Sequence, residues 1–142
     1  MLISDILRRK GSTVVTISAD ATVTELVASL AEHKIGALIV VEDGQTVGIV
    51  SERDVVRRLH QTGGQVLDLS VSELMTTSVI SCGPTDKVDD IAAAMTERRI
   101  RHMPVLTEGE LSGIVTIGDV VAARIADLEQ AQGQLESYIT QG

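Results

Sequence analysis

The chain contains no Phe or Trp, and it has one Tyr, one Cys and two Pro among 142 residues. Its core must therefore consist of Val, Ile, Leu, Ala and Met, a composition suited to short buried strands covered by helices. The single Cys82 excludes an internal disulfide and is typical of a reducing compartment, so we predict a cytoplasmic location. No apolar run approaches membrane-spanning length, and the N-terminus lacks the apolar stretch of a signal peptide, so we expect no membrane partner.

Positive charge is also scarce, because the formal net charge is −8 at pH 7. Neutralising nucleic-acid phosphates requires a basic face, so we expect no nucleic-acid partner, whereas a small phosphate pocket needs only a few Arg residues. The sequence has no His-Glu-x-x-His arrangement, no Walker loop and no Gly-rich dinucleotide fingerprint. His33, His60 and His102 have no metal-ligand spacing. We therefore predict a protein without catalytic activity, catalytic cofactor or metal.

What the sequence does contain is an internal duplication. Val14 to Val56 falls on Val79 to Val121 without a gap. The match is strongest at its end, where Gly48 to Val56 lies on Gly113 to Val121. A duplicated unit of this size predicts two repeats packed with pseudo-two-fold symmetry, so any site in one repeat should have a counterpart in the other.

Hydrophobic periodicity and turn signals predict that each copy folds as β-α-β-β-α, which gives an α/β (α+β) fold class with a C-terminal helix. The first copy is predicted as strand Thr13–Ser18, a helix opened by Thr22 and stopped by Gly36, strand Ala37–Val41, turn Asp43-Gly44, strand Thr46–Val50 and a helix capped by Ser51. The second is predicted as strand Val79–Cys82, helix Val88–Arg99, strand Met103–Leu106, turn Glu108-Gly109, strand Leu111–Val115 and a helix after Thr116. The predicted domains are an N-terminal lead-in helix (1–12), repeat 1 (13–61), a linker and second lead-in (62–77), repeat 2 (78–125) and a helical tail (126–142).

The tail after the second copy does not repeat. Its apolar residues Ile125, Leu128, Leu135 and Ile139 have coiled-coil spacing, and Gln132 occupies the skipped position of the seam. Two interpretations remain open from the pattern alone. The tail is either a helix that packs on its own domain or a helix that pairs with a second subunit.

The candidate site is the strand-to-helix junction that both copies share. Ser51 and Thr116 are predicted at helix N-caps, and Asp54 and Asp119 stand one turn into each helix. A hydroxyl beside free backbone N–H groups at a helix N-terminus can hold a phosphate or a ribose atom, and a carboxylate can accept both hydroxyls of a ribose diol. The alternative interpretation is a helix cap with a dipole partner. Recurrence of the pair at the same spacing in both copies weakens that alternative.

Through these residues the chain resembles a tandem pair of CBS domains, which are named after cystathionine β-synthase and are also called a Bateman module. The resemblance covers roughly Ile3 to Ile125. It implies a regulatory module that binds adenine nucleotides (AMP, ADP or ATP) in clefts between the repeats and senses energy or redox state, with NAD(H) or S-adenosylmethionine bound in some members. It also implies a homodimer, and we expect an unidentified effector protein in trans. The alternative is a structural dimerisation module with no physiological ligand.

The resemblance also assigns roles to individual residues. It implies that Asp54 and Asp119 bind ribose, and that Ser51 and Thr116 lie near ribose or phosphate. The residues implied to border the adenine through backbone groups are Thr16, Ile17, Ser81 and Cys82.

The two implied sites are chemically unequal. Arg101-His102-Met103-Pro104 matches the family's basic segment that faces phosphate, whereas its counterpart beginning Gly36-Ala37 lacks the basic pair and the proline. Arg53 lies in the first turn of a helix, a poor place for a cation unless an anion is near, and the second copy has Gly118 there. We expect a phosphorylated nucleotide beside Arg101 and His102, and a less charged ligand or a dinucleotide such as NAD(H) at the other site.

Overall fold

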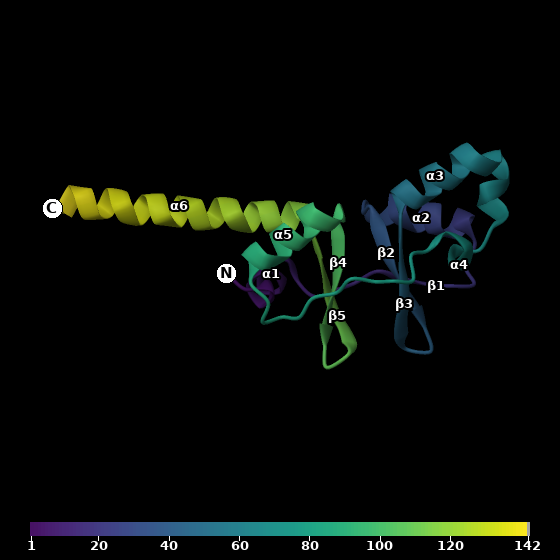
Figure 1. Cartoon of the computed structure of the whole chain (residues 1–142), viewed down its shortest axis with the longest axis horizontal. Helices are drawn as coiled ribbons and strands as arrows, with labels where there is room; N and C mark the ends of the chain where they lie inside the picture. Colours follow the sequence, from purple (N-terminus) through teal and green to yellow (C-terminus); the bar gives the residue numbers. More distant parts are fainter. Residues whose placement is uncertain (142) are drawn as a thin grey trace. The chain divides into compact units, whose positions relative to one another are not determined.

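The computed structural model describes residues 1–141 (Figure 1). Its elements in chain order are α1 (Ile3–Lys10), β1 (Thr16–Ser18), α2 (Val23–His33), β2 (Ala37–Glu42), β3 (Gln45–Ser51), α3 (Glu52–Thr62), the 3₁₀ helix η1 (Gly63–Asp68), α4 (Val71–Leu74), α5 (Val88–Arg98), β4 (His102–Thr107), β5 (Glu110–Thr116) and α6 (Ile117–Gln141). This order confirms the mixed α/β class and the C-terminal helix expected from the sequence. The domain boundaries drawn from the sequence stay predictions.

The chain forms two compact units, and each combines one repeat with a lead-in segment. The repeat-1 unit comprises residues 13–80 and 108–112, and the repeat-2 unit comprises residues 1–12, 81–107 and the chain from residue 113 onward. The N-terminal helix α1 therefore folds with the second repeat. The short helix α4, which precedes the second repeat in the sequence, folds with the first.

The repeat-1 unit is built on a three-stranded sheet in the order β1-β2-β3. β1 starts later than predicted, at Thr16, and runs parallel to β2, which runs antiparallel to β3. Asp43 and Gly44 join β2 to β3 with positive φ angles of 51° and 76°, the geometry of the two-residue hairpin turn predicted there. The apolar run that opens β2, Ala37 to Val40, is buried throughout, as expected of a strand covered on both faces.

Aliphatic side chains form the core of the repeat-1 unit. Its buried members are Ala19, Val23, Leu26, Leu30, Leu38, Val40, Val50, Val66, Val71 and Leu74. The start of α2 is fixed by a capping box in which Glu25 N–H donates to Thr22 Oγ1 at 3.2 Å and Thr22 N–H donates to Glu25 Oε2 at 3.1 Å. This cap sets the helical phase, and the phase turns the apolar face of α2 into the core.

The repeat-2 unit departs from prediction at its first strand. Val79–Cys82 is not a strand, because Cys82 alone forms a bridge, parallel to Val105. The two prolines of the chain explain the difference. Extending the parallel pairing by one hydrogen bond on either side of this bridge would require the backbone N–H groups of residues 84 and 104. Both residues are proline, which has no backbone N–H. What remains of this rung includes a hydrogen bond from Cys82 N to Pro104 O at 3.0 Å.

The duplication extends to unusual backbone conformations. Lys34 and Arg99 follow α2 and α5 with φ of 55° each, and Asp43 and Glu108 open the two hairpin turns with φ of 51° and 53°. Each pair occupies matching positions in the two copies. The helix stop predicted at Gly36 is therefore wrong by two residues, since α2 ends at His33 and the following lysine takes the left-handed conformation. A left-handed L-residue costs about 1–2 kcal/mol, so the fold, and not local preference, dictates the backbone at these positions.

Each unit packs its lead-in segment against a glycine of its last strand. In the repeat-1 unit, a Cβ on Gly48 would lie 2.8 Å from Met75 Sδ, and in the repeat-2 unit a Cβ on Gly113 would lie 2.8 Å from Leu7 Cδ2. Both distances are shorter than ordinary Cβ contacts, so a side chain at either position would require its neighbour to move. Glycine at these two positions therefore lets the lead-in segment contact the strand three residues before Ser51 and Thr116.

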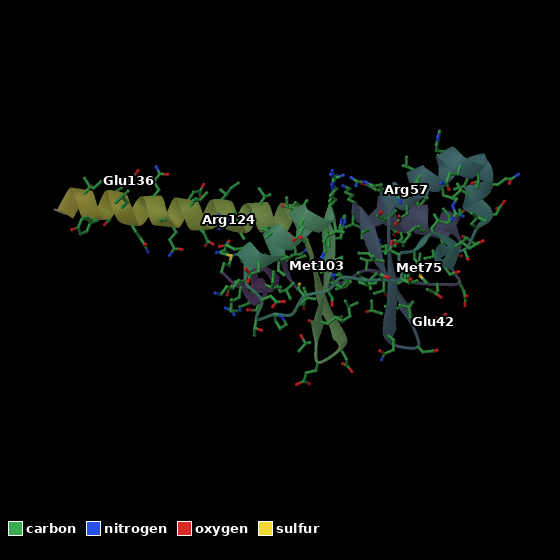
Figure 2. The ribbon with its side chains drawn as sticks, viewed as in Figure 1. Glu42, Arg57, Met75, Met103, Arg124 and Glu136 are labelled. Carbon is green, nitrogen blue, oxygen red and sulfur yellow. The ribbon has the colours of Figure 1, made fainter. Side chains whose placement is uncertain are left out.

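The helix α6 is continuous from Ile117 to Gln141, so the tail is an extension of the last helix of the second repeat. Its first turns pack on α1 and α5 within the repeat-2 unit, where Val120 and Ala123 are buried. Beyond them the helix exposes Ile125, Leu128 and the apolar residues that follow, so these side chains do not pack on their own domain. Figure 2 labels Arg124 and Glu136 on this helix. No helix formed by residues 1–141 is long and apolar enough to cross a membrane.

Candidate functional site

The first candidate junction lies where β3 runs into α3. Ser51 is the N-cap of α3, as predicted, and Asp54 is its third residue. The Ser51 N–H and hydroxyl both donate to Asp54 Oδ2, at 2.8 and 3.1 Å, while Asp54 N–H donates to Ser51 Oγ at 3.3 Å. Ala37 pairs with Ser51 across β2 and β3, so the backbone at Ala37 borders the same junction. Both side chains of the cap are half-buried and face one another across the helix start.

The second junction, between β5 and α6, repeats this geometry. Thr116 N–H donates to Asp119 Oδ2 at 2.9 Å, and Asp119 N–H donates to Thr116 Oγ1 at 3.2 Å. Ile117 N–H donates to the carbonyl of Arg101 at 2.9 Å, which places the segment Arg101-His102 beside the start of α6. Capping therefore accounts for one oxygen of each aspartate. Each junction still presents a carboxylate and a hydroxyl at the positive end of a helix dipole.

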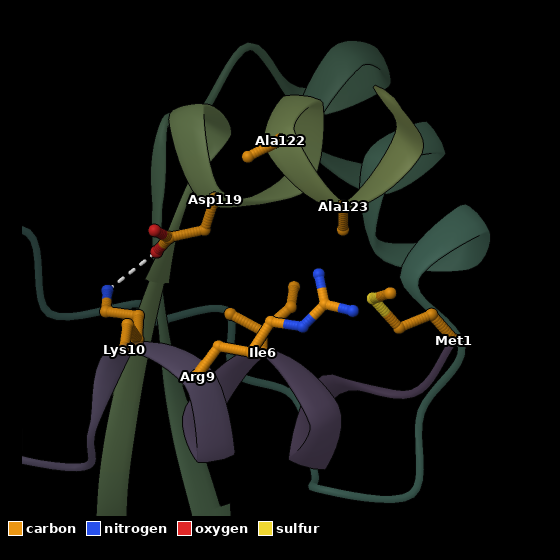
Figure 3. A pocket seen from close by; sticks show the side chains of 7 residues that line it. All are labelled: Met1, Ile6, Arg9, Lys10, Asp119, Ala122 and Ala123. Carbon is orange, nitrogen blue, oxygen red and sulfur yellow. Dashed lines mark hydrogen bonds and ion pairs between the residues drawn. The ribbon is translucent and has the colours of Figure 1, made fainter. Parts of the chain in front are cut away.

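Lys10 distinguishes the two junctions. Its ammonium lies 2.6 Å from Asp119 Oδ2 (Figure 3). It also donates to the carbonyl of Ile114 at 3.0 Å. The Lys10 and Asp119 side chains are 30% and 22% exposed, so the ion pair is only partly solvated. Asp54 has a weaker neighbour, because its Oδ1 is 3.9 Å from an exposed guanidinium of Arg57 on the same helix. A ligand that needs the Asp119 carboxylate must therefore share it with, or take it from, a lysine.

A cavity of about 200 Å³ lies next to this ion pair, between α1 and α6 (Figure 3). Its lining residues are Met1, Ile6, Arg9, Lys10, Asp119, Ala122 and Ala123. Pockets that enclose drug-sized ligands are about 300–1,000 Å³. The cavity is therefore large enough for part of a nucleotide and too small for all of it.

Lys10 was not among the site residues predicted from the sequence. The signal that could have found it is a second register of the duplication, in which Ile3 to Leu7 matches Val71 to Met75. The register then changes, because Arg8, Arg9 and Lys10 have no counterpart in the second lead-in. These three cations are thus an insertion specific to the segment that folds against Asp119.

The remaining predicted residues divide by exposure. The exposed ones are Thr16, Arg53, Ser81 and Arg101, the half-buried ones are Ile17 and His102, and the buried ones are Ala37, Cys82, Met103 and Pro104. Within residues 1–141, Arg53 and Arg101 pair with no carboxylate. A cation at the start of α3 interacts unfavourably with the positive end of the helix dipole, and no anion of the described chain offsets this interaction at Arg53.

Cys82 is unsuited to nucleophilic chemistry. The thiol is buried, and burial, with a smaller contribution from the charge of Asp86, raises its pKa to about 11. At neutral pH the thiolate, which is the reactive form, is therefore almost absent. The described residues also contain no group of three or more side chains that could hold a metal ion. The role predicted for Cys82, a backbone border to a ligand, is not affected by the state of its thiol.

Comparison with known families gives a direct match. The model for the CBS domain matches the chain twice, over residues 3–61 and 71–126. The chain belongs to the CBS-domain family. Both matches include a lead-in segment. Each matched stretch of sequence therefore contains a short helix that folds with the other repeat.

Relatives and solved structures agree with this assignment. The CBS domain-containing protein CBSX3, mitochondrial, of Arabidopsis thaliana is 34% identical over 149 residues, which cover 99% of this CBS pair and 72% of the relative. The crystal structure of the CBS-domain containing protein ATU1752 from Agrobacterium tumefaciens is 42% identical with a TM-score of 0.86, and covers 87% of this chain and 99% of that one. The CBS domain pair of protein MJ0100, in complex with 5′-methylthioadenosine and S-adenosyl-L-methionine, is 27% identical with a TM-score of 0.80 over 89% of this chain and 98% of that one.

Proposed function

We propose that this CBS pair is a non-catalytic regulatory module that binds adenine nucleotides at its two strand-to-helix junctions. The observation that carries the proposal is the recurrence of one constellation, a hydroxyl N-cap followed by a half-buried aspartate, at Ser51/Asp54 and at Thr116/Asp119. The similar MJ0100 pair binds two adenosine-containing molecules, which supports the same ligand class for this chain.

The chemistry of the junction suits a ribose. A carboxylate accepts from both hydroxyls of a cis-diol, and each aspartate has a second oxygen besides the one engaged in the cap. Thr16-Ile17 and Ser81-Cys82 are proposed to border the adenine through their backbone groups. His102, Met103 and Pro104 continue the segment that begins beside the second junction.

The two sites are proposed to prefer different ligands. The junction at Asp119 has Lys10 and the backbone of Arg101 beside it, so it is suited to a phosphorylated nucleotide such as AMP, ADP or ATP. The junction at Asp54 has Arg53 as its own cation, and it is proposed to take a less charged ligand or a dinucleotide such as NAD(H).

Thermal unfolding of the full chain against AMP, ADP, ATP, NAD, NADH and S-adenosylmethionine tests the proposal. A ligand at a hundred times its Kd stabilises by about 2.7 kcal/mol, which corresponds to roughly 5–10 °C for a chain of this size. Asp119→Asn and Asp54→Asn keep an acceptor for the cap but lose the charge, and each should abolish the shift of one ligand class.

Glu25→Gln is the matched control, because Glu25 occupies the same capping position in α2 and is part of neither junction. It should lower the baseline stability and leave every ligand shift intact. Absence of any shift, in protein shown to be free of bound nucleotide, contradicts the proposal. Retention of all shifts in both aspartate variants contradicts the assignment of the site.

The output of the module is proposed to be a change in the surface offered to an effector protein in trans, in the cytoplasm. A ligand can shift such an equilibrium only by its differential affinity for two states. A homodimer is the proposed assembly. Self-association without a physiological ligand is the second candidate function, and it is favoured by the apolar side chains that α6 exposes along its length.

A further inference from the structure

We propose that α6, from Val121 onward, pairs in parallel with the same helix of a second copy, as a two-stranded coiled coil. The surface is the α6 stripe, defined as Val121, Ile125, Leu128, Gln132, Leu135 and Ile139. These residues alternate at spacings of four and three, so they occupy successive d and a positions of one heptad frame. This inference specifies the surface and orientation of the proposed homodimer and does not depend on nucleotide binding.

The aliphatic side chains of the stripe are largely exposed, and within the described chain Gln132 donates only to Glu136 Oε1 of its own helix, at 3.2 Å. The five aliphatic members of the stripe are at least half exposed, from 50% at Val121 to 68% at Ile139, and Tyr138 beside them is 77% exposed. By contrast, the side of α6 that carries Val120 and Ala123 is buried against the repeat-2 unit. Pairing two such stripes would remove on the order of 1,000 Å² from water, the lower limit for a specific interface.

The extended part of α6 also needs a partner to be stable as a helix. Gly133 lies in its middle with nothing within 4 Å of its Cβ position, and glycine in an exposed helix costs about 1 kcal/mol relative to alanine. The family match ends at residue 126, so the helix runs on beyond the module without contacts from it. Packing of an apolar face, and not intrinsic propensity, stabilises most protein helices.

The polar member of the stripe favours a second copy in parallel. Gln132 takes a central a position, where a parallel pair places it against Gln132 of the partner subunit. Two amides can donate to and accept from one another. An antiparallel pair with full overlap would place Gln132 against the apolar Leu128, which offers its amide no hydrogen bond across the interface. A single polar residue at an a position is the feature that fixes register and oligomeric state in coiled coils.

The flanking charges select the same orientation. Arg124 falls at a g position, and Glu129 and Glu136 fall at e positions. In a parallel pair the g residue faces the e residue of the next heptad on the partner, so Arg124 meets the partner's Glu129. An antiparallel pair brings e positions together and opposes glutamates. Arg124 already pairs with Asp89 of its own chain, but a guanidinium has donors for both carboxylates.

Sedimentation velocity of the full chain over a concentration series tests the surface. The wild type should form dimers, and Leu128→Asp with Leu135→Asp should weaken association at least a hundredfold. The matched control is Gln130→Asp with Ser137→Asp, which adds the same charges at exposed f positions and should leave association unchanged. Circular dichroism must show the module folded in both. A monomeric wild type overturns both the homodimer and this inference. Dimers that persist in the Leu128/Leu135 variant overturn this inference alone.

Disulfide trapping tests the orientation. In a parallel pair Ile125 lies against the partner's Ile125, so Ile125→Cys should give a covalent dimer on mild oxidation, whereas the buried Cys82 should not cross-link. In an antiparallel pair the residue opposite is Leu135. Cross-linking of Ile125→Cys with itself supports the parallel coil. Cross-linking that requires a mixture of Ile125→Cys and Leu135→Cys chains overturns it.

Discussion

Replacing Gly48 and Gly113 by alanine, one at a time, should have unequal effects although the two positions are equivalent in the duplication. The Cβ of Gly48→Ala would lie 2.8 Å from Met75 Sδ and 2.9 Å from the backbone oxygen of Thr76. The Cβ of Gly113→Ala would meet only Leu7, at 2.8 and 2.9 Å from its two methyl carbons and 3.4 Å from Cγ. One obstacle is therefore partly backbone, and the other is the end of a side chain.

The difference in mobility sets the magnitude. The Thr76 carbonyl accepts from Ile49 N at 3.0 Å, and Thr76 N–H donates back to Ile49 O at 2.9 Å, so this backbone is fixed to the strand next to Gly48. Overpacking that forces backbone shifts costs about 1–3 kcal/mol. Leu7 is half-buried and can change rotamer, while alanine in place of glycine returns about 0.5–1 kcal/mol through chain entropy. We expect Gly48→Ala to cost about 2 kcal/mol and Gly113→Ala less than about 1 kcal/mol.

Urea unfolding followed by circular dichroism measures both costs, and second-site variants separate the causes. Leu7→Ala should relieve most of the cost of Gly113→Ala, since the two groups that collide are then both small. Met75→Ala should relieve only part of the cost of Gly48→Ala, because the Thr76 carbonyl stays in place. Equal costs for the two glycines, or complete relief of Gly48→Ala by Met75→Ala, would refute the argument.

Three further predictions concern single residues. Glu108→Asn should raise the free energy of unfolding by about 0.5–1 kcal/mol, because asparagine tolerates the left-handed turn position better than glutamate; an unchanged urea midpoint would contradict this. The pKa of the Cys82 thiol is 9.0 when unperturbed and about 11 in the fold, so the folded state binds the thiol proton more tightly than the unfolded state does. The stability that this difference contributes is fully present below pH 9 and is lost between pH 9 and 11. A Cys82→Ser control should show a smaller decline in stability over that range. Lys10→Met should tighten adenosine binding about fivefold, or roughly 1 kcal/mol, because it frees the Asp119 carboxylate. Arg9→Met is the control and should leave the affinity unchanged, since Arg9 lines the same cavity but is not bonded to Asp119. Weaker binding of adenosine to the Lys10→Met variant in calorimetry would show that Lys10 contacts the ligand instead.

The sequence predicted the repeats and the capped junctions because both depend on local rules. Thr22 and Glu25 follow the capping-box pattern, and the structure forms that box. Ser51 and Asp54 follow the same rule, so their positions relative to one another are determined by helix geometry. The hairpin turn at Asp43 is likewise encoded in two residues. Whether the junctions bind a ligand is not a local property and stays a prediction.

What the sequence could not predict depends on partners distant in the chain. The strand expected over Val79–Cys82 is reduced to one bridge because of Pro104, a residue on the neighbouring strand. Lys10 and Asp119 form an ion pair although they are far apart in the sequence, and no periodic pattern connects them. Excluding a tail that packs on its own domain needed the exposure of Ile125 and Leu128, which a heptad pattern does not contain.

The exchange of lead-in helices has a consequence for how the protein is made. The repeat-1 unit draws its core from one nearly continuous stretch of chain, so it can condense on the ribosome as soon as α4 has emerged. The repeat-2 unit must wait, since α1 is synthesised before repeat 1 and its strand partner around Gly113 is synthesised after repeat 1. Closing that loop is the long-range step that should slow folding. A substitution that weakens the packing of α1 would therefore affect the repeat-2 unit, whose strands are synthesised only after repeat 1 is complete.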